Sequence, residues 1–230
     1  MRRRSLALFG LVLLAGSASA DVPASSCPPA RYYLLLFGGQ GNILRPRTAH
    51  TWATYVRAEP RPDGTVGLDQ FTISWLPATL TIRPWAVRSE PGVNLDLHRT
   101  LKFMSGGWQR ISLWGPYEVC EEHFSSAARH CQELEAGAYT YRVFDFCQIN
   151  PHVSHCVHAV TRADPAFYRA SPPILWFGSI GTAPVARSLM KSGIVSDPRT
   201  THDWLLPALG LDERAFIRRT PGDWRPVVRR

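Results

Sequence analysis

The chain has 230 residues, of which 45% are hydrophobic, and a formal net charge of +8. This length and apolar content can bury one full hydrophobic core and exclude an intrinsically disordered chain. No segment after the N-terminus approaches the ~20 consecutive apolar residues of a membrane-spanning helix. No nucleic-acid-binding motif accompanies the positive charge, so we do not expect nucleic acid as a partner.

Residues 1–20 have the pattern of a secretory signal peptide. Arg2–Arg4 form a basic start, Leu6–Leu14 form a short apolar core, and Ala18–Ala20 supply small residues for cleavage before Asp21. Removal of this segment lowers the formal charge from +8 to +5, because it contains three arginines. The sequence therefore predicts an exported protein, periplasmic or secreted, without a membrane span or a lipid anchor.

After the leader, we expect a lead-in over 21–30, a single domain over 31–219 and a basic tail over 220–230. Arginines near the C-terminus are expected to be solvated and to make weak, salt-sensitive contacts with anionic surfaces. These arginines are Arg214, Arg218, Arg219, Arg225, Arg229 and Arg230.

The first half of the chain is predicted to be mainly strands. Gly38–Asn42 and Pro60–Gly64 have turn composition and should separate the first three strands. Gly115–Pro116 should close a later strand, and 94–104 has no clear preference. The predicted strands are 32–37, 50–58, 71–76 and 111–114, with an edge extension over 79–87 that Pro84 limits.

The second half is predicted to be mainly helices, with one further strand over 139–146. The predicted helices are 118–136, 155–163, 183–191, 201–209 and 212–218. Strands followed by helices indicate an α+β fold, in which an antiparallel sheet from the N-terminal half packs with helices from the C-terminal half.

The five cysteines set limits on the disulfides. Cys120 and Cys131 lie on one predicted helix, ~16.5 Å apart at 1.5 Å per residue, so they cannot bond each other. An odd number of cysteines leaves at least one unpaired within the chain. If Cys156 is free, Cys120 and Cys131 would pair with Cys27 and Cys147, in either order. The alternative is a disulfide that includes Cys156 itself, with Cys147 as its partner.

The segment Asn150–Ala159 concentrates three histidines around Cys156. If Ser154 caps the helix, the cysteine lies in the first turn, where backbone N–H groups and the helix dipole favour a thiolate. If Asn150 is the cap, with Pro151 at the first helical position, the cysteine lies in the second turn and gains less. The sequence leaves both registers open.

A cysteine nucleophile also needs a base, and the neighbouring histidines point away from it on a helix. His50 is our choice, because it begins a strand after a turn-forming segment. If the second and third strands form a hairpin, the residue opposite His50 lies near Ser74. We therefore expect Ser74 to hydrogen-bond and orient the imidazole.

The pieces His50–Val56 and Ser154–Ala159 give an order of histidine on a strand, then cysteine on a helix. This order resembles the circularly permuted papain-like cysteine hydrolases, over about half of the chain. The resemblance implies that Cys156 is the nucleophile and His50 the general base. It also implies that the backbone N–H of Cys156 holds the oxyanion, and that the substrate is an amide, peptide or ester. No cofactor is expected.

Two other functions remain open. His152, His155 and His158 recur every three residues, and with Cys156 nearby they could bind zinc or copper. His123, His130 or His202 would complete such a site. The other reading is a non-enzymatic, disulfide-stabilised exported domain. In that hypothesis Cys156 is structural, and His152 and His158 lie on the surface.

Overall fold

A computed structural model describes residues 29–40, 49–106, 110–145, 150–170 and 178–223. Within these ranges the chain forms two sheets and several helices, which confirms the α+β class. The sheets come largely from the N-terminal half and most helices from the C-terminal half. The predicted signal peptide, 1–20, lies outside the described residues.

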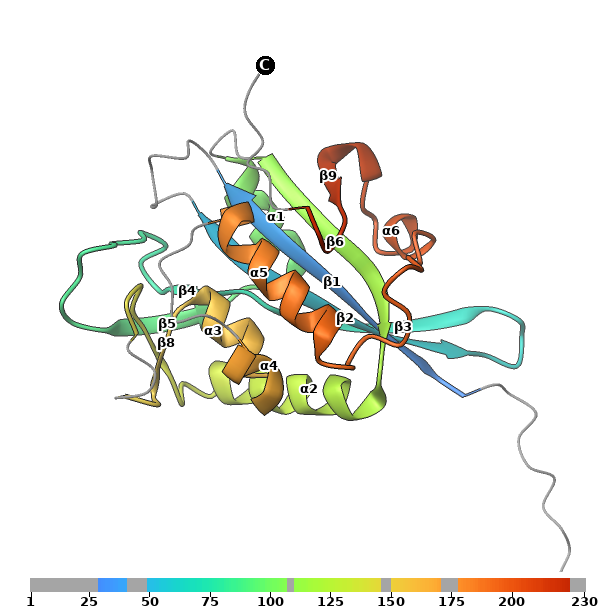
Figure 1. Ribbon diagram of the computed structural model, residues 1–230, viewed down its shortest axis with the longest axis horizontal. Coiled ribbons are helices and arrows are strands. Elements are labelled where there is room, and N and C mark those ends of the chain that lie inside the picture. Colours follow the sequence, from blue (N-terminus) through green and yellow to red (C-terminus); the bar gives the residue numbers. More distant parts are fainter. Residues whose placement is uncertain (1–28, 41–48, 107–109, 146–149, 171–177, 224–230) are drawn as a thin grey trace, which may run out of the picture.

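The larger sheet has the strand order β3-β2-β1-β6-β9 (Figure 1). Four of its strands pair antiparallel, whereas β9 pairs parallel to β6, so the sheet is mixed rather than purely antiparallel. The strands are β1 (Arg31–Gln40), β2 (His50–Pro60), β3 (Val66–Ile73), β6 (Arg110–Val119) and β9 (Phe216–Arg219).

A smaller sheet has the strand order β4-β5-β7-β8, and its first strand directly follows β3 of the larger sheet in the chain. Only Ser74 separates β3 from β4, so the predicted strand 71–76 is divided between the two sheets. The last strand of the smaller sheet, β8, lies just before Cys156 in the chain. The strands are β4 (Trp75–Pro77), β5 (Glu90–Asn94), β7 (Thr140–Tyr141) and β8 (Val153–Ser154).

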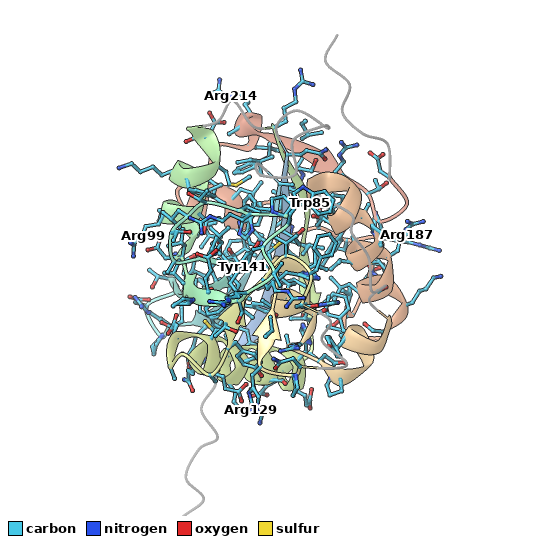
Figure 2. The ribbon with its side chains drawn as sticks, turned by 90° about the vertical axis from the view of Figure 1, so that its left-hand side faces the viewer. Trp85, Arg99, Arg129, Tyr141, Arg187 and Arg214 are labelled. Atoms are coloured by element: carbon cyan, nitrogen blue, oxygen red, sulfur yellow. The ribbon has the colours of Figure 1, made fainter. Side chains whose placement is uncertain are left out.

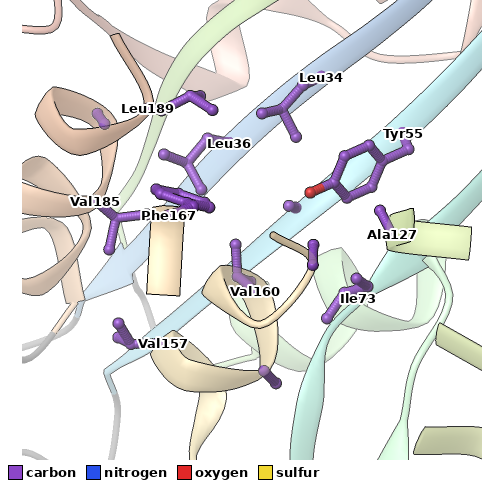
Figure 3. Close-up of a cluster of buried hydrophobic side chains, with 14 of the residues drawn as sticks. Leu34, Leu36, Tyr55, Ile73, Ala127, Val157, Val160, Phe167, Val185 and Leu189 are labelled. Carbon is purple, nitrogen blue, oxygen red and sulfur yellow. The ribbon is translucent and has the colours of Figure 1, made fainter. Parts of the chain in front are cut away.

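Helices cover both faces of the larger sheet. Since strand side chains alternate between faces, Leu34 and Leu36 of β1 pack with α2, α3 and α5 (Figure 3), whereas Leu35 and Phe37 pack with α1 and α6. No helix in the described ranges is long and apolar enough to cross a membrane. The helices are α1 (Leu97–Ser105), α2 (Glu121–Glu135), α3 (Cys156–Thr161), α4 (Pro165–Ala170), α5 (Gly178–Lys191) and α6 (Leu205–Ala208).

Two glycine positions that sequence analysis took for strand ends lie inside strands. β1 continues through Gly39, where a Cβ would lie 2.0 Å from the Cε of Met104, so this glycine permits close packing rather than a turn. β6 continues through Gly115, which has a φ of 86° at an irregularity in the pairing with β1. The predicted strand end at 115–116 is therefore wrong, because a bulge absorbs the irregular residues.

Several other boundaries also differ from prediction. Residues 79–87 form turns, and only Thr140–Tyr141 of the predicted strand 139–146 is a strand. The stretch 212–218, predicted to be helical, is a short 3-10 turn followed by β9. The helix predicted from Glu118 begins at Glu121, since residues up to Val119 pair with β1. In each case pairing between distant segments overrides the local pattern.

The cysteines of the described residues carry no disulfide: Cys120, Cys131 and Cys156 are free thiols. The prediction that Cys120 and Cys131 do not bond each other is confirmed, because Cys120 is the N-cap of α2 and Cys131 lies eleven residues further along the same continuous helix. Cys27 and Cys147 lie outside the described residues. Each predicted pairing with them also needs Cys120, Cys131 or Cys156, and none of these three is bonded in this structure.

Part of the C-terminal charge belongs to the folded domain rather than to a solvated tail. The side chain of Arg219 is buried and bonds Asp223 and Ser112. Arg218 forms an ion pair with Asp203. Arg225, Arg229 and Arg230 lie outside the described residues.

A glycine in β5 provides a test of the core that joins the two sheets. A Cβ on Gly92 would lie 1.9 Å from Cζ2 of Trp75, whose side chain is buried. We expect Gly92→Ala to lower the free energy of unfolding by ~1–3 kcal/mol through overpacking, measured by urea denaturation. Gly222→Ala, where nothing lies within 4 Å, is the control. Trp75→Phe in the Gly92→Ala background should recover part of the loss; unchanged stability of Gly92→Ala would contradict this packing.

Candidate active site

The helix that carries the cysteine begins at Cys156, and His155 is its N-cap. The Nδ1 atom of His155 accepts hydrogen bonds from the backbone N–H groups of Val157 (3.1 Å) and His158 (3.3 Å). The cap is thus neither Ser154, which lies in β8, nor Asn150, because an imidazole replaces the usual capping oxygen. Cys156 consequently occupies the first turn, as the first of the two predicted registers requires.

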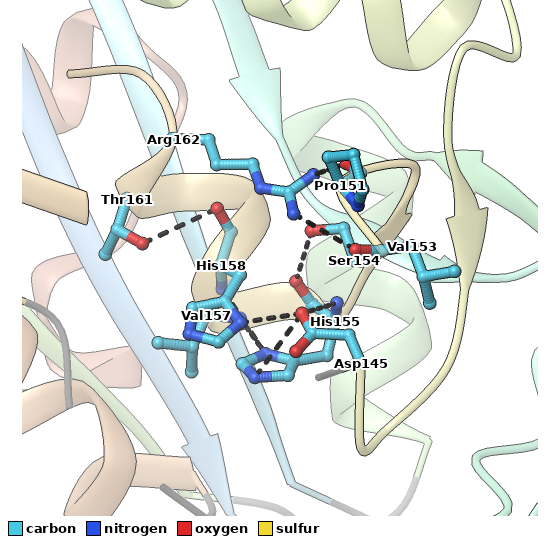
Figure 4. Close-up of polar contacts among 9 residues, drawn as sticks. All are labelled: Asp145, Pro151, Val153, Ser154, His155, Val157, His158, Thr161 and Arg162. Carbon is cyan, nitrogen blue, oxygen red and sulfur yellow. Dashed lines mark hydrogen bonds and ion pairs between the residues drawn. The ribbon is translucent and has the colours of Figure 1, made fainter. Parts of the chain in front are cut away.

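Asp145 fixes the start of α3 from outside the helix (Figure 4). Its Oδ2 atom accepts from the backbone N–H of His155 at 3.1 Å and lies 2.6 Å from Nδ1 of His158. Burial raises the pKa of Asp145, but the hydrogen bond with His158 and the adjacent His155 outweigh it and hold the pKa below its usual value. The two imidazoles stack with ring centroids 4.0 Å apart. An ionised Asp145 therefore orients both rings.

Arg162, at the other end of α3, holds the segment that precedes the helix. Its guanidinium donates to the carbonyl groups of Pro151 (2.7 Å) and Val153 (3.1 Å), as Figure 4 shows. Asp145 and Arg162 together thus fix the chain around Cys156.

The thiol of Cys156 is half-buried and lies against β2. Burial raises its pKa to about 11, although the backbone N–H groups of Thr51, Val157 and Cys156 itself act on the sulfur in the opposite direction. Burial is the main cause that raises the pKa of the Tyr141 phenol. The charge of a Cys156 thiolate would raise it further, because Tyr141 lies close to the sulfur. The thiol is therefore neutral at neutral pH, with hydrogen-bond donors directed at its sulfur.

His50 is buried at the start of β2. Within the described residues, its imidazole is hydrogen-bonded at one nitrogen only. Its Nε2 atom lies 2.9 Å from Oγ of Ser74, which confirms the predicted hydrogen bond. Ser74 is in turn 2.8 Å from the hydroxyl group of Thr100, and the imidazole stacks on Trp52. Burial lowers the pKa of His50 to about 3. The Nδ1 atom is buried and has no hydrogen-bond partner among the residues that the structure describes.

The structure brings Cys156 to the segment that contains His50 without joining the two side chains. Thr51, whose N–H acts on the sulfur, directly follows His50 in the chain. No hydrogen bond links Cys156 with His50 in the described part of the chain, and the hydroxyl group of Thr51 bonds Thr182 of α5 instead. Because side chains alternate along β2, His50 lies with Trp52 and α1 on one face of the sheet, whereas Thr51 and Cys156 lie with α3 and α5 on the other. The strand therefore separates the imidazole from the thiol, and the predicted pair of nucleophile and base is not formed in this structure.

The predicted metal ligands are only partly brought together. Ligand atoms of Asp145, His155 and His158 lie within 4.8 Å of one another, whereas His152 is exposed and Cys156 is not part of the group. The 2.6 Å contact between Asp145 and His158 is a hydrogen bond, shorter than the ~3.3 Å between two ligand atoms on one tetrahedral zinc. His123, His130 and His202 have other partners, namely Tyr55, Glu133 and Glu118.

Two site residues were missed by sequence analysis. Asp145 lies ten residues before His155 on a different segment, and Thr100 belongs to α1, 26 residues after Ser74. Neither has a sequence signal of its own, since an isolated carboxylate or hydroxyl residue is common on any surface. Only the packing of distant segments identifies them.

Comparisons with known proteins give no relative of this chain. No family model, curated protein or solved structure matches it. The assignment of a function therefore depends on the site itself.

Buried neutral histidines predict a loss of stability in acid. Burial lowers the pKa of His50 and His155 to about 3 and that of His123 to about 4, against 6.5 for an ordinary histidine. Below pH 6.5 the unfolded chain therefore binds more protons than the folded chain. The free energy of unfolding should fall by up to ~1.4 kcal/mol per pH unit for each such histidine as the pH drops toward 4.

Urea denaturation at a series of pH values measures this slope. His123→Gln should reduce the slope by about one proton, whereas His152→Gln, at an exposed position, should leave it unchanged. Equal slopes for all three proteins would show that these histidines are not buried in their neutral form.

Proposed function

We propose that this chain is an exported thiol hydrolase or acyltransferase that acts on amide, peptide or ester bonds. Cys156 is the nucleophile, His50 the general base and Ser74 the residue that orients the base. One observation supports the proposal: Cys156 lies in the first turn of α3, where the backbone N–H groups of Thr51, Val157 and Cys156 itself act on its sulfur. His50 is proposed as the base because it precedes Thr51, its Nε2 is held by Ser74, and its buried Nδ1 has no partner among the described residues. Because the imidazole lies on the other face of β2, the start of this strand must turn before the base can act.

The chemical steps follow from the two nitrogens of His50. The reaction requires the start of β2 to turn so that Nδ1 faces the thiol while Nε2 donates its proton to Ser74. Nδ1 then accepts the thiol proton as the sulfur attacks the substrate carbonyl carbon. The oxyanion is held by the backbone N–H of Cys156. The imidazolium then protonates the leaving amine or alcohol, which departs and leaves a thioester. Water or an acceptor nucleophile cleaves the thioester and restores the thiol.

The resting site holds a neutral thiol and a neutral imidazole rather than an ion pair. The pKa of Cys156 is raised to about 11 and that of His50 is lowered to about 3, both by burial. Proton transfer therefore accompanies the attack and is general-base catalysis. The start of β2 has to turn on substrate binding, because the imidazole and the thiol lie on opposite faces of this strand and no hydrogen bond joins them in the described structure.

A second function is supported by the grouping of Asp145, His155 and His158. A metal-binding protein would use these three side chains, with the neutral His155 as a ligand. Zinc titration by calorimetry, with Asp145→Asn as the variant, separates this function from the first. Zinc binding that is lost in Asp145→Asn would favour the metal site. The absence of any heat of binding in the native protein would contradict it.

Trapping of an acyl-enzyme tests the hydrolase. After exposure to p-nitrophenyl acetate, mass spectrometry of the native protein should find the acetyl group on the peptide that contains Cys156. The rate of p-nitrophenolate release should fall at least about a hundredfold in Cys156→Ser and in His50→Gln, because nucleophile or base is lost. Cys120→Ser and His152→Gln are matched controls and should keep the native rate. Acetylation spread evenly over Cys120, Cys131 and Cys156 would contradict a nucleophilic role.

The pH dependence of acylation tests the protonation states. Because the pKa of His50 is about 3, the rate should not decline as the pH falls from 7 through 6.5, where an ordinary histidine would be protonated. Ser74→Ala should lower kcat about tenfold with little change in KM, since only the orientation of the imidazole is lost. A rate that titrates with a midpoint near 6.5 would show that another histidine is the base.

A further inference from the structure

The loop of residues 78–89 between β4 and β5, here named the Trp85 loop, exposes large apolar side chains. Trp85 is 82% exposed, Val87 is 84% exposed and Leu80 is 42% exposed. Single exposed apolar residues are normal, but three within one twelve-residue loop form a concentrated apolar tip.

The loop is anchored, so the apolar side chains are held outward by structure. Ile82 is buried with Leu76 and Leu95 in a small core cluster beneath the loop. The N–H of Ala78 donates to the carbonyl of Pro91 at 2.8 Å. Arg142 donates to the carbonyl of Val87 at 3.0 Å. The backbone that presents Trp85 and Val87 is therefore fixed to the smaller sheet at both ends.

The charge of the loop has one sign. Arg83 and Arg88 are exposed and flank Trp85 and Val87, and the loop contains no acidic residue. In the described ranges neither arginine forms an ion pair, whereas Arg214 and Arg219 pair with Asp212 and Asp223. Two unneutralised cations beside an apolar tip are complementary to a surface that is apolar inside and anionic outside.

We propose that the Trp85 loop docks this protein on an anionic lipid membrane. Trp85 enters the interfacial region, where an indole places its apolar rings and its N–H in suitable surroundings, and Leu80 and Val87 enter beside it. Arg83 and Arg88 contact lipid phosphates, and the overall positive charge attracts the protein to the same surface. Attachment is peripheral and reversible, because three apolar side chains bury too little area for permanent anchoring.

The Trp85 loop lies on the same side of the molecule as part of the Cys156 site. Figure 2 shows Trp85 and Tyr141 on the side that faces the viewer. The loop leads into β5, which pairs with β7, and β7 pairs with the β8 strand that precedes α3. Docking is independent of the proposed chemistry, but it would turn this side of the protein toward the lipid.

Vesicle co-sedimentation of the full mature protein tests the docking. Binding should be strong to vesicles of phosphatidylcholine with phosphatidylglycerol, weak to phosphatidylcholine alone, and reduced by salt. Trp85→Ala should weaken binding at least about tenfold, whereas Trp204→Ala, at an exposed tryptophan elsewhere, should not. Replacement of Arg83 and Arg88 by Gln should weaken binding about fivefold for each arginine. Arg99→Gln and Arg187→Gln are the charge-matched controls.

Other results would overturn the proposal. Equal loss of binding in the Arg99 and Arg187 controls would show that net charge alone acts, without the loop. Loss of binding only when Arg225, Arg229 and Arg230 are replaced by Gln would assign membrane contact to the C-terminus. If the native protein ignores both kinds of vesicle but self-associates, and Trp85→Ala makes it monomeric, a second copy covers the loop.

Discussion

The hydrogen bonds of Asp145 determine where α3 begins, and the position of the thiol depends on that start. A carboxylate that accepts from the backbone of His155 and holds the ring of His158 stops the chain from continuing the helix toward Ser154. The Nδ1 of His155 then caps the first turn, and Cys156 follows as its first residue. One residue earlier or later, the sulfur would rotate by about 100° and leave the N–H of Thr51.

Burial acts on the thiol of Cys156 and the imidazole of His50 in the same direction. A buried thiol resists losing its proton and a buried imidazole resists gaining one, so each is held neutral. The two groups therefore do not form an ion pair in the resting protein. In the proposed reaction, transfer of the proton from sulfur to Nδ1 would require the start of β2 to turn, and the N–H donors around the sulfur would stabilise the negative charge that forms. The low solvent exposure that weakens the nucleophile at rest thus also protects a thioester from water.

Sequence reasoning predicted the fold class, the separation of Cys120 from Cys131 and the bond between His50 and Ser74. These succeed because each depends on a local period or on a single hairpin. The register shows how narrow the success is: Ala53 pairs with Ile73, so continued pairing would place residue 76, not Ser74, opposite His50. Ser74 reaches the imidazole because the strand breaks there and β4 joins another sheet. Asp145, β9 and the bulge at Gly115 depend on contacts between distant segments, which no local pattern encodes.

The histidine cluster that stands out in the sequence serves mainly to build the site. One ring nitrogen of His155 caps the helix, and the ring stacks on His158, which is held by Asp145. Neither ring is therefore free to face the thiol in the described arrangement. Among the described residues, His50, His123 and His130 each have a buried imidazole nitrogen without a partner. His50 lies over a hundred positions before His155, where the sequence shows only one histidine at the start of a strand. A dense group of titratable residues can therefore be scaffolding, because groups that satisfy one another have no remaining hydrogen-bonding capacity for a substrate. A buried polar atom that the fold leaves without a partner, such as Nδ1 of His50, retains this capacity.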